Sequence, residues 1–414
     1  MKLPHLGVGV LDQLLSSASN ALIVFAIARV STVDSFGTIS LALAALSSTL
    51  LISRGVFGAP IALLSNRPTD LGFEVSHAFG AAGVLGSAVS FLIIPLSLPA
   101  GGYAMAVVLG LAVPIVLIQD VGRFYVTAAS RPGVAALSDG LWAASALLLL
   151  LTTFLPEPPL GSLGLIVGWT VSAFVSAVLV IALGGAYPRL HGIRRWFAAS
   201  RYHRSTFGLD AVVGALGSFV LIWLVGFWLG PPAIAAVRGA GTVLGPIAAL
   251  VSAIQFAVIP ELRRRGLPVQ ALWSALVRIA LPMSVVSLGI AAVSLLIPAS
   301  WGHILLGDSW TLVRTVLPIM GAEYAAISWY AAVAAGLTVR AKSGSLLALR
   351  TTHVALSAVA VVLGAGVFMS VRVVATGFVA AVVFATLGGR RALLSGTRRE
   401  QPDPDRSDPT EGRR

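Results

Sequence analysis

The chain has 414 residues, of which 57% are hydrophobic and only 11% are charged, and its formal net charge is +12. Soluble globular domains carry roughly 25% charged residues, so this composition excludes that class and indicates an integral membrane protein. Cysteine is absent, which excludes disulfides and thiolate metal sites.

Long apolar runs recur along the chain, and a helix needs roughly 20 such residues to cross the hydrocarbon of a bilayer. We therefore predict an all-α integral membrane protein with about twelve transmembrane helices. A β-barrel would instead alternate polar and apolar residues over about ten positions. The predicted spans are 10–30, 36–53, 73–96, 102–124, 135–155, 162–185, 208–229, 233–258, 272–297, 312–337, 345–368 and 372–388.

The first predicted span has one polar face. Read as a helix, it places Asp12, Ser16, Ser19 and Asn20 at i, i+4, i+7 and i+8, which is a single face. Polar side chains within a membrane are costly and normally face a protein interior or a water-filled cavity. We expect Asp12, Ser16 and Asn20 to line such a cavity.

Basic residues are concentrated in alternate loops. If the N-terminus is cytoplasmic, 23 of the 28 Lys and Arg residues fall on the cytoplasmic side, as the positive-inside rule requires. The surplus of positive charge therefore indicates membrane orientation rather than nucleic-acid binding. We predict a multi-pass protein of the cell (inner or plasma) membrane with both termini in the cytoplasm.

A basic segment at 186–207 divides the spans into six and six. It contains five Arg and two His and no acid, with Trp196, Phe197 and Tyr202 among the basic residues, which is typical of an interfacial segment. Asp210 then opens the seventh span much as Asp12 opens the first, which suggests two equivalent halves. The predicted organisation is an N-terminal six-helix lobe (1–185), a basic cytoplasmic linker (186–207), a C-terminal six-helix lobe (208–388) and a disordered cytoplasmic tail (389–414).

Three stretches then carry a recognisable pattern: LDQLLSSASNALIVFAIARVSTVDSFGTISLALA at 11–44, VRGAGTVLGPIAALVSAIQFAVIPELRRR at 237–265 and ILLGDSWTLVRTVLPIM at 304–320. Together they resemble polysaccharide-biosynthesis flippases of the O-antigen type, in the multidrug/oligosaccharidyl-lipid/polysaccharide exporter superfamily. The resemblance covers residues 10–388 and implies two six-helix lobes that form a V around a central cavity and alternate between inward-open and outward-open forms.

Two features depart from the superfamily's other patterns. The chain shows no sign of the two extra C-terminal spans of the peptidoglycan-precursor (lipid II) flippases, which argues against that branch. Its outer loops are also short for a polysaccharide exporter.

Five arginines lie within predicted spans, apart from Arg123 and Arg350, which are counted with the cytoplasmic segments. The cargo that the resemblance implies, a lipid-linked sugar, carries phosphate or diphosphate, and guanidinium groups offer paired donors with permanent charge to such groups. Arg29, Arg238 and Arg278 are therefore candidate substrate-binding cations. The alternative is snorkelling, in which a long side chain near a helix end reaches interfacial water, and we favour it for Arg314 and Arg372.

Acids in the spans are fewer. Glu323 lies near the middle of its span, where an ionised acid costs roughly 3 kcal/mol, so it is a candidate for ion coupling or for pairing with a cavity arginine. A structural salt bridge is the alternative. Asp120 and Arg123 are three residues apart, which predicts an ion pair within one helix. Asp12, Glu74, Asp139 and Asp210 begin spans, where acids cap helices.

No pattern indicates an enzyme. The chain lacks a glycine-rich phosphate loop followed by Lys-Ser or Lys-Thr, a GxSxG elbow and an HExxH pair, and its six His are scattered. We expect no cofactor and no metal. The predicted function is translocation of a polyprenyl-diphosphate-linked oligosaccharide or polysaccharide precursor from the cytoplasmic to the outer leaflet.

The predicted partners are a lipid-linked glycan, H+ or Na+ as a coupling ion, and a glycan polymerase or glycosyltransferase. Two alternatives stay open: an ion-coupled multidrug exporter of the same superfamily, and a non-transporting scaffold of a glycan-assembly complex. A cationic drug calls for an acidic cavity, and the five in-span arginines against few acids argue the other way.

Overall fold

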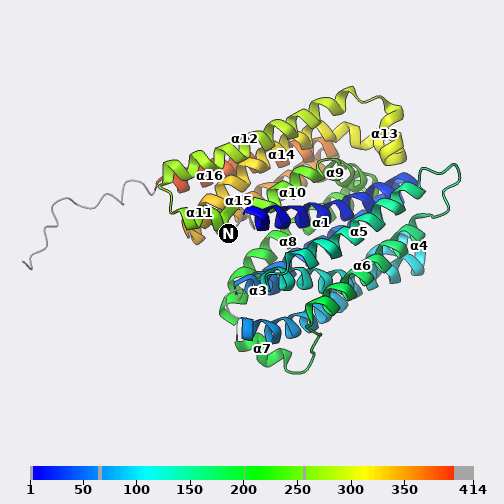
Figure 1. Ribbon diagram of the computed structural model, residues 1–414. Coiled ribbons are helices and arrows are strands. Elements are labelled where there is room, and N and C mark those ends of the chain that lie inside the picture. Colours follow the sequence, from blue (N-terminus) through cyan, green and yellow to red (C-terminus); the bar gives the residue numbers. More distant parts are fainter. Residues whose placement is uncertain (1–2, 64–67, 200, 255–257, 396–414) are drawn as a thin grey trace, which may run out of the picture.

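The computed structural model describes residues 3–63, 68–199, 201–254 and 258–395. Every regular element in these ranges is a helix, and most of the long helices run side by side in one bundle (Figure 1). The predicted all-α class is therefore confirmed. The side chains of residues 1–14 and of residue 210 lie outside the described set, so the predictions for Asp12 and Asp210 do too.

The first half of the chain contains α1 (Leu3–Val30), α2 (Val33–Ser53), the π-helical turn η1 (Arg54–Gly58), α3 (Ala59–Leu63), α4 (Pro68–Ala128), α5 (Pro132–Thr152) and α6 (Ser162–Gly184). The second half contains α7 (Ile193–Ala199), α8 (Arg201–Leu229), α9 (Pro231–Val243), α10 (Gly245–Ala253), α11 (Ile259–Arg265), α12 (Val269–Leu296), α13 (Ala299–Leu306), η3 (Gly307–Ser309), α14 (Trp310–Val339), α15 (Ser343–Val361), η4 (Val362–Val367) and α16 (Val371–Leu394).

Ten helices in the described ranges are long and apolar enough to cross a membrane. The helices α9 and α10 meet at a bend of 64° and together would form an eleventh span. The described apolar part of α1 covers Leu15–Val30, within a helix of 28 residues. In the described parts of the chain, the twelve predicted ranges thus fall on helical backbone except at Leu244, where α9 and α10 meet, and at the C-terminal ends of four ranges, residues 153–155, 185, 297 and 368.

Two predicted spans share the single element α4. Its 61 residues are broken at Gly101 and Gly102, and Gly102 has a φ of 72°, in the left-handed region that glycine tolerates best. The chain therefore reverses at this point, between the predicted spans 73–96 and 102–124. The two long arms of α4 lie on either side of the break.

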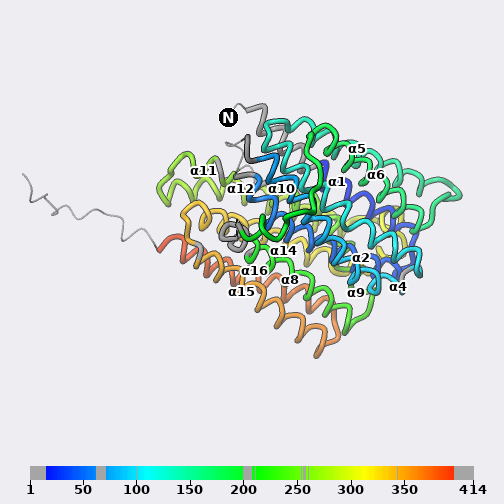
Figure 2. The backbone as a smooth tube through the Cα atoms, turned by 90° about the horizontal axis from the view of Figure 1, so that it is seen from below, coloured from blue at the N-terminus to red at the C-terminus, as the bar shows by residue number. Residues whose placement is uncertain are grey.

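The same helix pairings occur in both halves when α1, α2, α4, α5 and α6 are matched in chain order with α8, α9, α14, α15 and α16. In the first half, α1 packs on α5, α2 on α4, α4 on α6, and α5 on α6. In the second half, α8 packs on α15, α9 on α14, α14 on α16, and α15 on α16. Contacts between the halves run mainly through α1 and α2 against α8, α9 and α10. Figure 2 shows α4, α5 and α6 at one side of the molecule and α12, α15 and α16 at the other.

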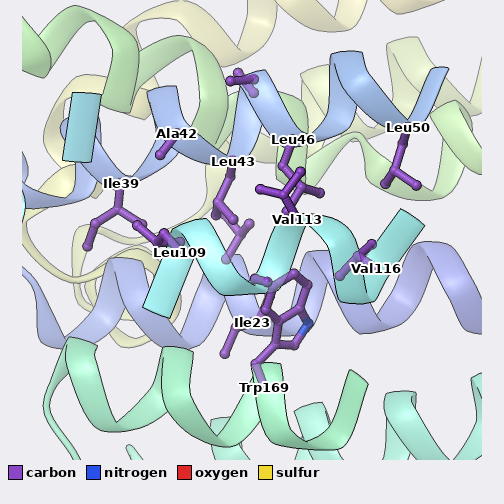
Figure 3. Close-up of a cluster of buried hydrophobic side chains, with 14 of the residues drawn as sticks. Ile23, Ile39, Ala42, Leu43, Leu46, Leu50, Leu109, Val113, Val116 and Trp169 are labelled. Atoms are coloured by element: carbon purple, nitrogen blue, oxygen red, sulfur yellow. The ribbon is translucent and has the colours of Figure 1, made fainter. Parts of the chain in front are cut away.

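The main apolar core lies where the first-half helices meet. Ile23 of α1, Leu43 of α2, Val113 of α4 and Trp169 of α6 are all buried and point toward one another (Figure 3). The same cluster continues into Ile234 of α9, so one core joins the two halves. Because lipid tails are as apolar as these side chains, close packing rather than exclusion from water holds the helices together.

The basic linker forms the short helix α7, which packs on the end of α4. Trp196 is buried and donates its Nε1–H to Glu74 Oε2 at 2.8 Å, while the ring of His77 stacks on it at a centroid distance of 5.8 Å. Glu74 therefore binds an indole. Arg194 and Arg195 are exposed on the same short helix, so its aromatic side is anchored and its cations face outward.

We predict that Gly37→Ala destabilises the protein, because α2 and α9 approach too closely for a side chain. A Cβ at Gly37 would collide with the carbonyl oxygen of Pro231. We expect the free energy of unfolding to fall by about 1–3 kcal/mol, as for other overpacked sites. Thermal unfolding in detergent measures this. Gly289→Ala is the matched control, because a Cβ there meets open space; equal melting temperatures for the two variants would contradict the prediction.

Candidate functional site

A buried charge network lies in the first half. Arg54, the first residue of η1, donates Nε–H to both carboxylate oxygens of Asp120 at 3.0 and 3.1 Å, and Nη2–H to Oδ1 at 2.7 Å. Arg123 donates Nη1–H to Asp120 Oδ1 at 3.1 Å, so the predicted ion pair within one helix is confirmed. Asp120 thus binds two arginines, from two different segments.

Arg123 extends the network to two further helices. Its Nη1–H also reaches Ser16 Oγ at 2.8 Å on α1, and its Nε lies 2.8 Å from Asp139 Oδ2 on α5. Gln119 donates to the other Asp139 oxygen at 2.6 Å. Asp139 is completely buried two turns into α5, which begins at Pro132, so its predicted role as a cap is wrong.

The network balances two guanidinium groups against two carboxylates. Arg123, Asp120 and Asp139 are all buried, whereas the Arg54 side chain keeps 25% exposure. Removing such charges from water is costly, and only mutual pairing offsets the cost. We therefore interpret this network as structural: it ties α1, η1, α4 and α5 together and presents no free charge to a ligand.

The polar face of α1 contributes to this interior. Ser16 is buried against Arg123, and Asn20 donates its side-chain amide to the Ser16 carbonyl at 3.1 Å. Neither contact places a polar atom in an open lumen. Their assignment to a cavity wall stays a prediction.

Arg29 lies at the outer end of α1 and joins three segments. Its Nε–H donates to the carbonyl of Thr153 at 2.9 Å, its Nη1–H contacts the carbonyl of Ile304, and its guanidinium lies 4.1 Å from the centroid of the Phe154 ring. Thr153 follows α5, and Ile304 belongs to α13 in the second half. Arg29 therefore connects the C-terminal end of α1 to the second half, at the end of the bundle that we predict to be the outer one.

Arg238 and Glu323 lie on facing helices, α9 and α14. Arg238 Nε and Glu323 Oε2 are buried atoms without a hydrogen-bond partner among the described residues. Tyr324, which follows Glu323 on α14, interacts electrostatically with both side chains, and its hydroxyl lies 3.5 Å from the position of a Cβ at Gly241. We call these three residues, Arg238, Glu323 and Tyr324, the α9–α14 polar cluster.

The cluster lies next to the bend in the eighth predicted span. Arg238 is six residues before Leu244, where α9 ends and the chain turns by 64° into α10. Pro246 follows at the start of α10, and a proline there removes a backbone donor that would continue the helix. The position of the cluster therefore couples two unpaired ionisable groups to a break in a membrane-spanning segment.

The remaining in-span cations lie elsewhere. Arg278 is exposed on α12 and makes no ion pair or hydrogen bond within the described chain. Arg314 is exposed and donates to the carbonyl of Leu295 at 3.4 Å, and Arg372 is exposed near the start of α16. The structure thus brings Arg238 and Glu323 into one cluster and leaves Arg29 and Arg278 outside it. In the described ranges, no group of three His, Cys, Asp or Glu residues is placed to hold a metal ion.

No protein-family model and no curated protein matches the chain. Solved structures, in contrast, do match the chain. The lipid II flippase MurJ in an inward closed conformation superposes with a TM-score of 0.71 at 9% identity, covering 95% of this chain and 87% of that one. An inward-facing multidrug resistance MATE family transporter of the MOP superfamily gives 0.66 at 14% identity, covering 93% and 96%.

A third structure is similar over an equal length. It is a MOP superfamily transporter from Pyrococcus furiosus, with a TM-score of 0.60, 13% identity and 94% coverage of both chains, and its description reads "reverse polarity of binding pocket suggests different function". At such low identities the likeness concerns the fold alone. This chain therefore has the fold of MOP superfamily transporters, and the O-antigen branch stays a prediction.

We predict that Arg123→Met strongly destabilises the protein, because it leaves the buried Asp139 carboxylate without its cation. Breaking a buried pair by removing one partner costs about 3–5 kcal/mol of unfolding free energy. Arg278→Met is the matched control, an exposed in-span arginine whose loss we expect to change stability by less than about 0.5 kcal/mol.

The double variant Arg123→Met/Asp139→Leu extends this test. It removes both charges, so we expect it to recover part of the lost stability. Chemical or thermal unfolding in detergent measures all three proteins. An Arg123→Met variant as stable as Arg278→Met would show that the network is not structural.

Proposed function

We propose that the protein is a membrane transporter that moves a polyprenyl-diphosphate-linked oligosaccharide or polysaccharide precursor from the cytoplasmic to the outer leaflet by alternating access. The observation that carries the proposal is Arg238, a cation within the bundle whose Nε is buried and unpaired. The MOP superfamily fold supports a transporter of this general kind.

The charged side chains buried in the two halves favour an anionic cargo. In the first half, the carboxylates of Asp120 and Asp139 are each neutralised by arginine, so they offer nothing to a cationic drug. In the second half, Arg238 has no carboxylate partner among the described side chains and remains available. A guanidinium in a low-dielectric setting binds phosphate oxygens with paired, charge-assisted hydrogen bonds. The diphosphate of a lipid-linked glycan has this chemistry.

The two halves provide the moving parts of the proposed cycle. Because four helix pairings recur in each half, we propose that residues 1–185 and 208–388 act as two lobes that rock against each other. Contacts through α1, α2, α8, α9 and α10 form the axis of this motion. Arg29 holds the outer ends together, so the cargo would enter from the opposite, basic end, which we predict to be cytoplasmic.

Glu323 is the proposed coupling site for H+ or Na+. Its buried carboxylate oxygen lacks a partner, and a carboxylate at that depth is stable only when it is protonated, paired or ion-bound. Tyr324 interacts electrostatically with both Glu323 and Arg238, and we propose that it relays a change of charge at one group to the other. Ion binding at Glu323 would thereby alter the affinity of Arg238 for phosphate.

The second candidate function is ion-coupled multidrug export, which the MATE transporters with this fold favour. A cationic drug requires an acidic site, whereas the α9–α14 polar cluster contains one arginine and one acid. The Pyrococcus furiosus protein, described as having a binding pocket of reverse polarity, illustrates that pocket charge differs within this fold. A non-transporting scaffold, partnered with a glycan polymerase or glycosyltransferase, would not need the cluster's charges at all.

We predict that Arg238→Gln lowers translocation of a labelled polyprenyl-diphosphate oligosaccharide in proteoliposomes by at least about tenfold, the effect of losing one charge-assisted hydrogen bond. Arg314→Gln, at an exposed outer position, should translocate normally. Wild-type protein that moves no lipid-linked glycan but expels cationic dyes would establish the multidrug alternative. Full activity in Arg238→Gln would support the scaffold or a different site.

We predict that Glu323→Gln removes the stimulation of transport by an ion gradient and preserves binding of the lipid-linked glycan. Glutamine keeps the size of the side chain but can neither ionise nor bind a proton. The measurement compares translocation with and without an imposed H+ or Na+ gradient. Undiminished stimulation in the variant would place coupling at another residue.

A further inference from the structure

A groove on the second half lies outside the proposed transport pathway. It has a volume of about 420 Å³ and runs between α12 and α16 over the surface of α14. Its lining includes Trp273, Trp329, Arg390, Thr386, Ala326 and Val383. Sites for small-molecule ligands commonly have volumes of roughly 300–1,000 Å³, so the groove has room for part of one lipid.

The groove faces away from the first half. Helix α12 packs on α14 and α10, and α16 packs on α14, α15, η4 and α9; neither has substantial packing against any described element before α9. Figure 1 shows α12 at the edge of the bundle farthest from α6 and α7. Val383 and Leu387, which line the groove, are 43% and 51% exposed, as lipid-facing side chains would be. The groove therefore opens to the bilayer rather than to the space between the halves.

The groove has a charged end and an apolar end. Arg390, in the last turns of α16, places its guanidinium 5.3 Å from the ring centroid of Trp273, which is four residues into α12. Ala326 lies thirteen residues before the end of α14, so at 1.5 Å per residue the groove reaches from roughly 6 to roughly 20 Å inside the helix ends. This is the depth of a lipid's phosphate, glycerol and upper acyl chain on one leaflet.

The two helices that form the walls of the groove carry only positive charge. The two walls, α12 and α16, contain four arginines and no acid along their whole lengths. Arg390 is exposed and has no carboxylate partner in the described chain, and Arg278 follows the groove residue Val277 directly. Cations at the membrane surface attract anionic lipids by about 1 kcal/mol each. Tryptophans at this level suit the interface because their rings are amphipathic.

We propose that this groove binds one anionic phospholipid of the inner leaflet, with the phosphate at Arg390 and one acyl chain along Ala326 and Val383. Because α14 forms the floor of the groove and also contains Glu323, the lipid would brace the helix that holds the α9–α14 polar cluster. The site is independent of the cargo, so lipid binding is measured without a transport assay.

The test is native mass spectrometry of the full chain in detergent, titrated with phosphatidylglycerol and separately with phosphatidylcholine. Wild type should retain one phosphatidylglycerol in preference to phosphatidylcholine. Arg390→Gln should weaken that binding about fivefold, the equivalent of one interfacial cation. Arg391→Gln is the matched control, because this neighbouring arginine is exposed but does not line the groove.

A second variant separates shape from charge. Ala326→Phe fills the floor of the groove, so it should reduce retention of phosphatidylglycerol although Arg390 and Arg391 remain in place. Thermal unfolding without added lipid confirms that each variant is folded. Equal retention of the two lipids by wild type, or equal loss in Arg390→Gln and Arg391→Gln, would overturn the proposal, as would undiminished binding in Ala326→Phe.

Discussion

A charge inside a bilayer has no water to hydrate it, and every charged group in this bundle is placed under that constraint. In the first half, buried charged groups satisfy this constraint by pairing with groups of opposite charge. Asp120 and Asp139 each lie against an arginine, and these contacts cross from helix to helix, so the same bonds that neutralise the charges also fix the packing. The second half has similar helix pairings but a different solution, because Arg238 and Glu323 each keep a buried atom unpartnered.

Because of this difference, the two halves are suited to different roles. A fully satisfied polar network rigidifies its surroundings, whereas a partly satisfied one has alternative arrangements of similar energy. The first half is therefore suited to act as a fixed frame, with α7 and Trp196 bracing its end. The second half, with a 64° break beside Arg238 and an unpaired acid on α14, is suited to respond to a ligand.

Much of the fold was predictable because hydropathy and helix length report directly on the bilayer. The ion pair between Asp120 and Arg123 was predictable too, since a spacing of three residues places side chains on one helical face. The contacts of Arg54 with Asp120 were not, because 66 residues separate them and no local pattern encodes that meeting. Arg29 was recognised as a special cation, but its partners are backbone carbonyls, which every residue possesses and no sequence pattern reveals. The break within the eighth span is a third such case: Pro246 indicated a kink, yet its angle depends on tertiary packing.

The outer closure made by Arg29 has an energetic consequence. Only one of the contacts of Arg29 crosses between the halves, the hydrogen bond from its guanidinium to the carbonyl of Ile304, because Thr153 and Phe154 belong to the same half as Arg29. Hydrogen bonds to charged groups contribute about 1.5–3 kcal/mol each, so releasing this tie costs only a few kcal/mol. Moving one elementary charge through a membrane potential supplies about 2.3 kcal/mol per 100 mV. In the alternating-access cycle proposed above, the work of one or two transferred ions would therefore be enough to break this contact between the halves.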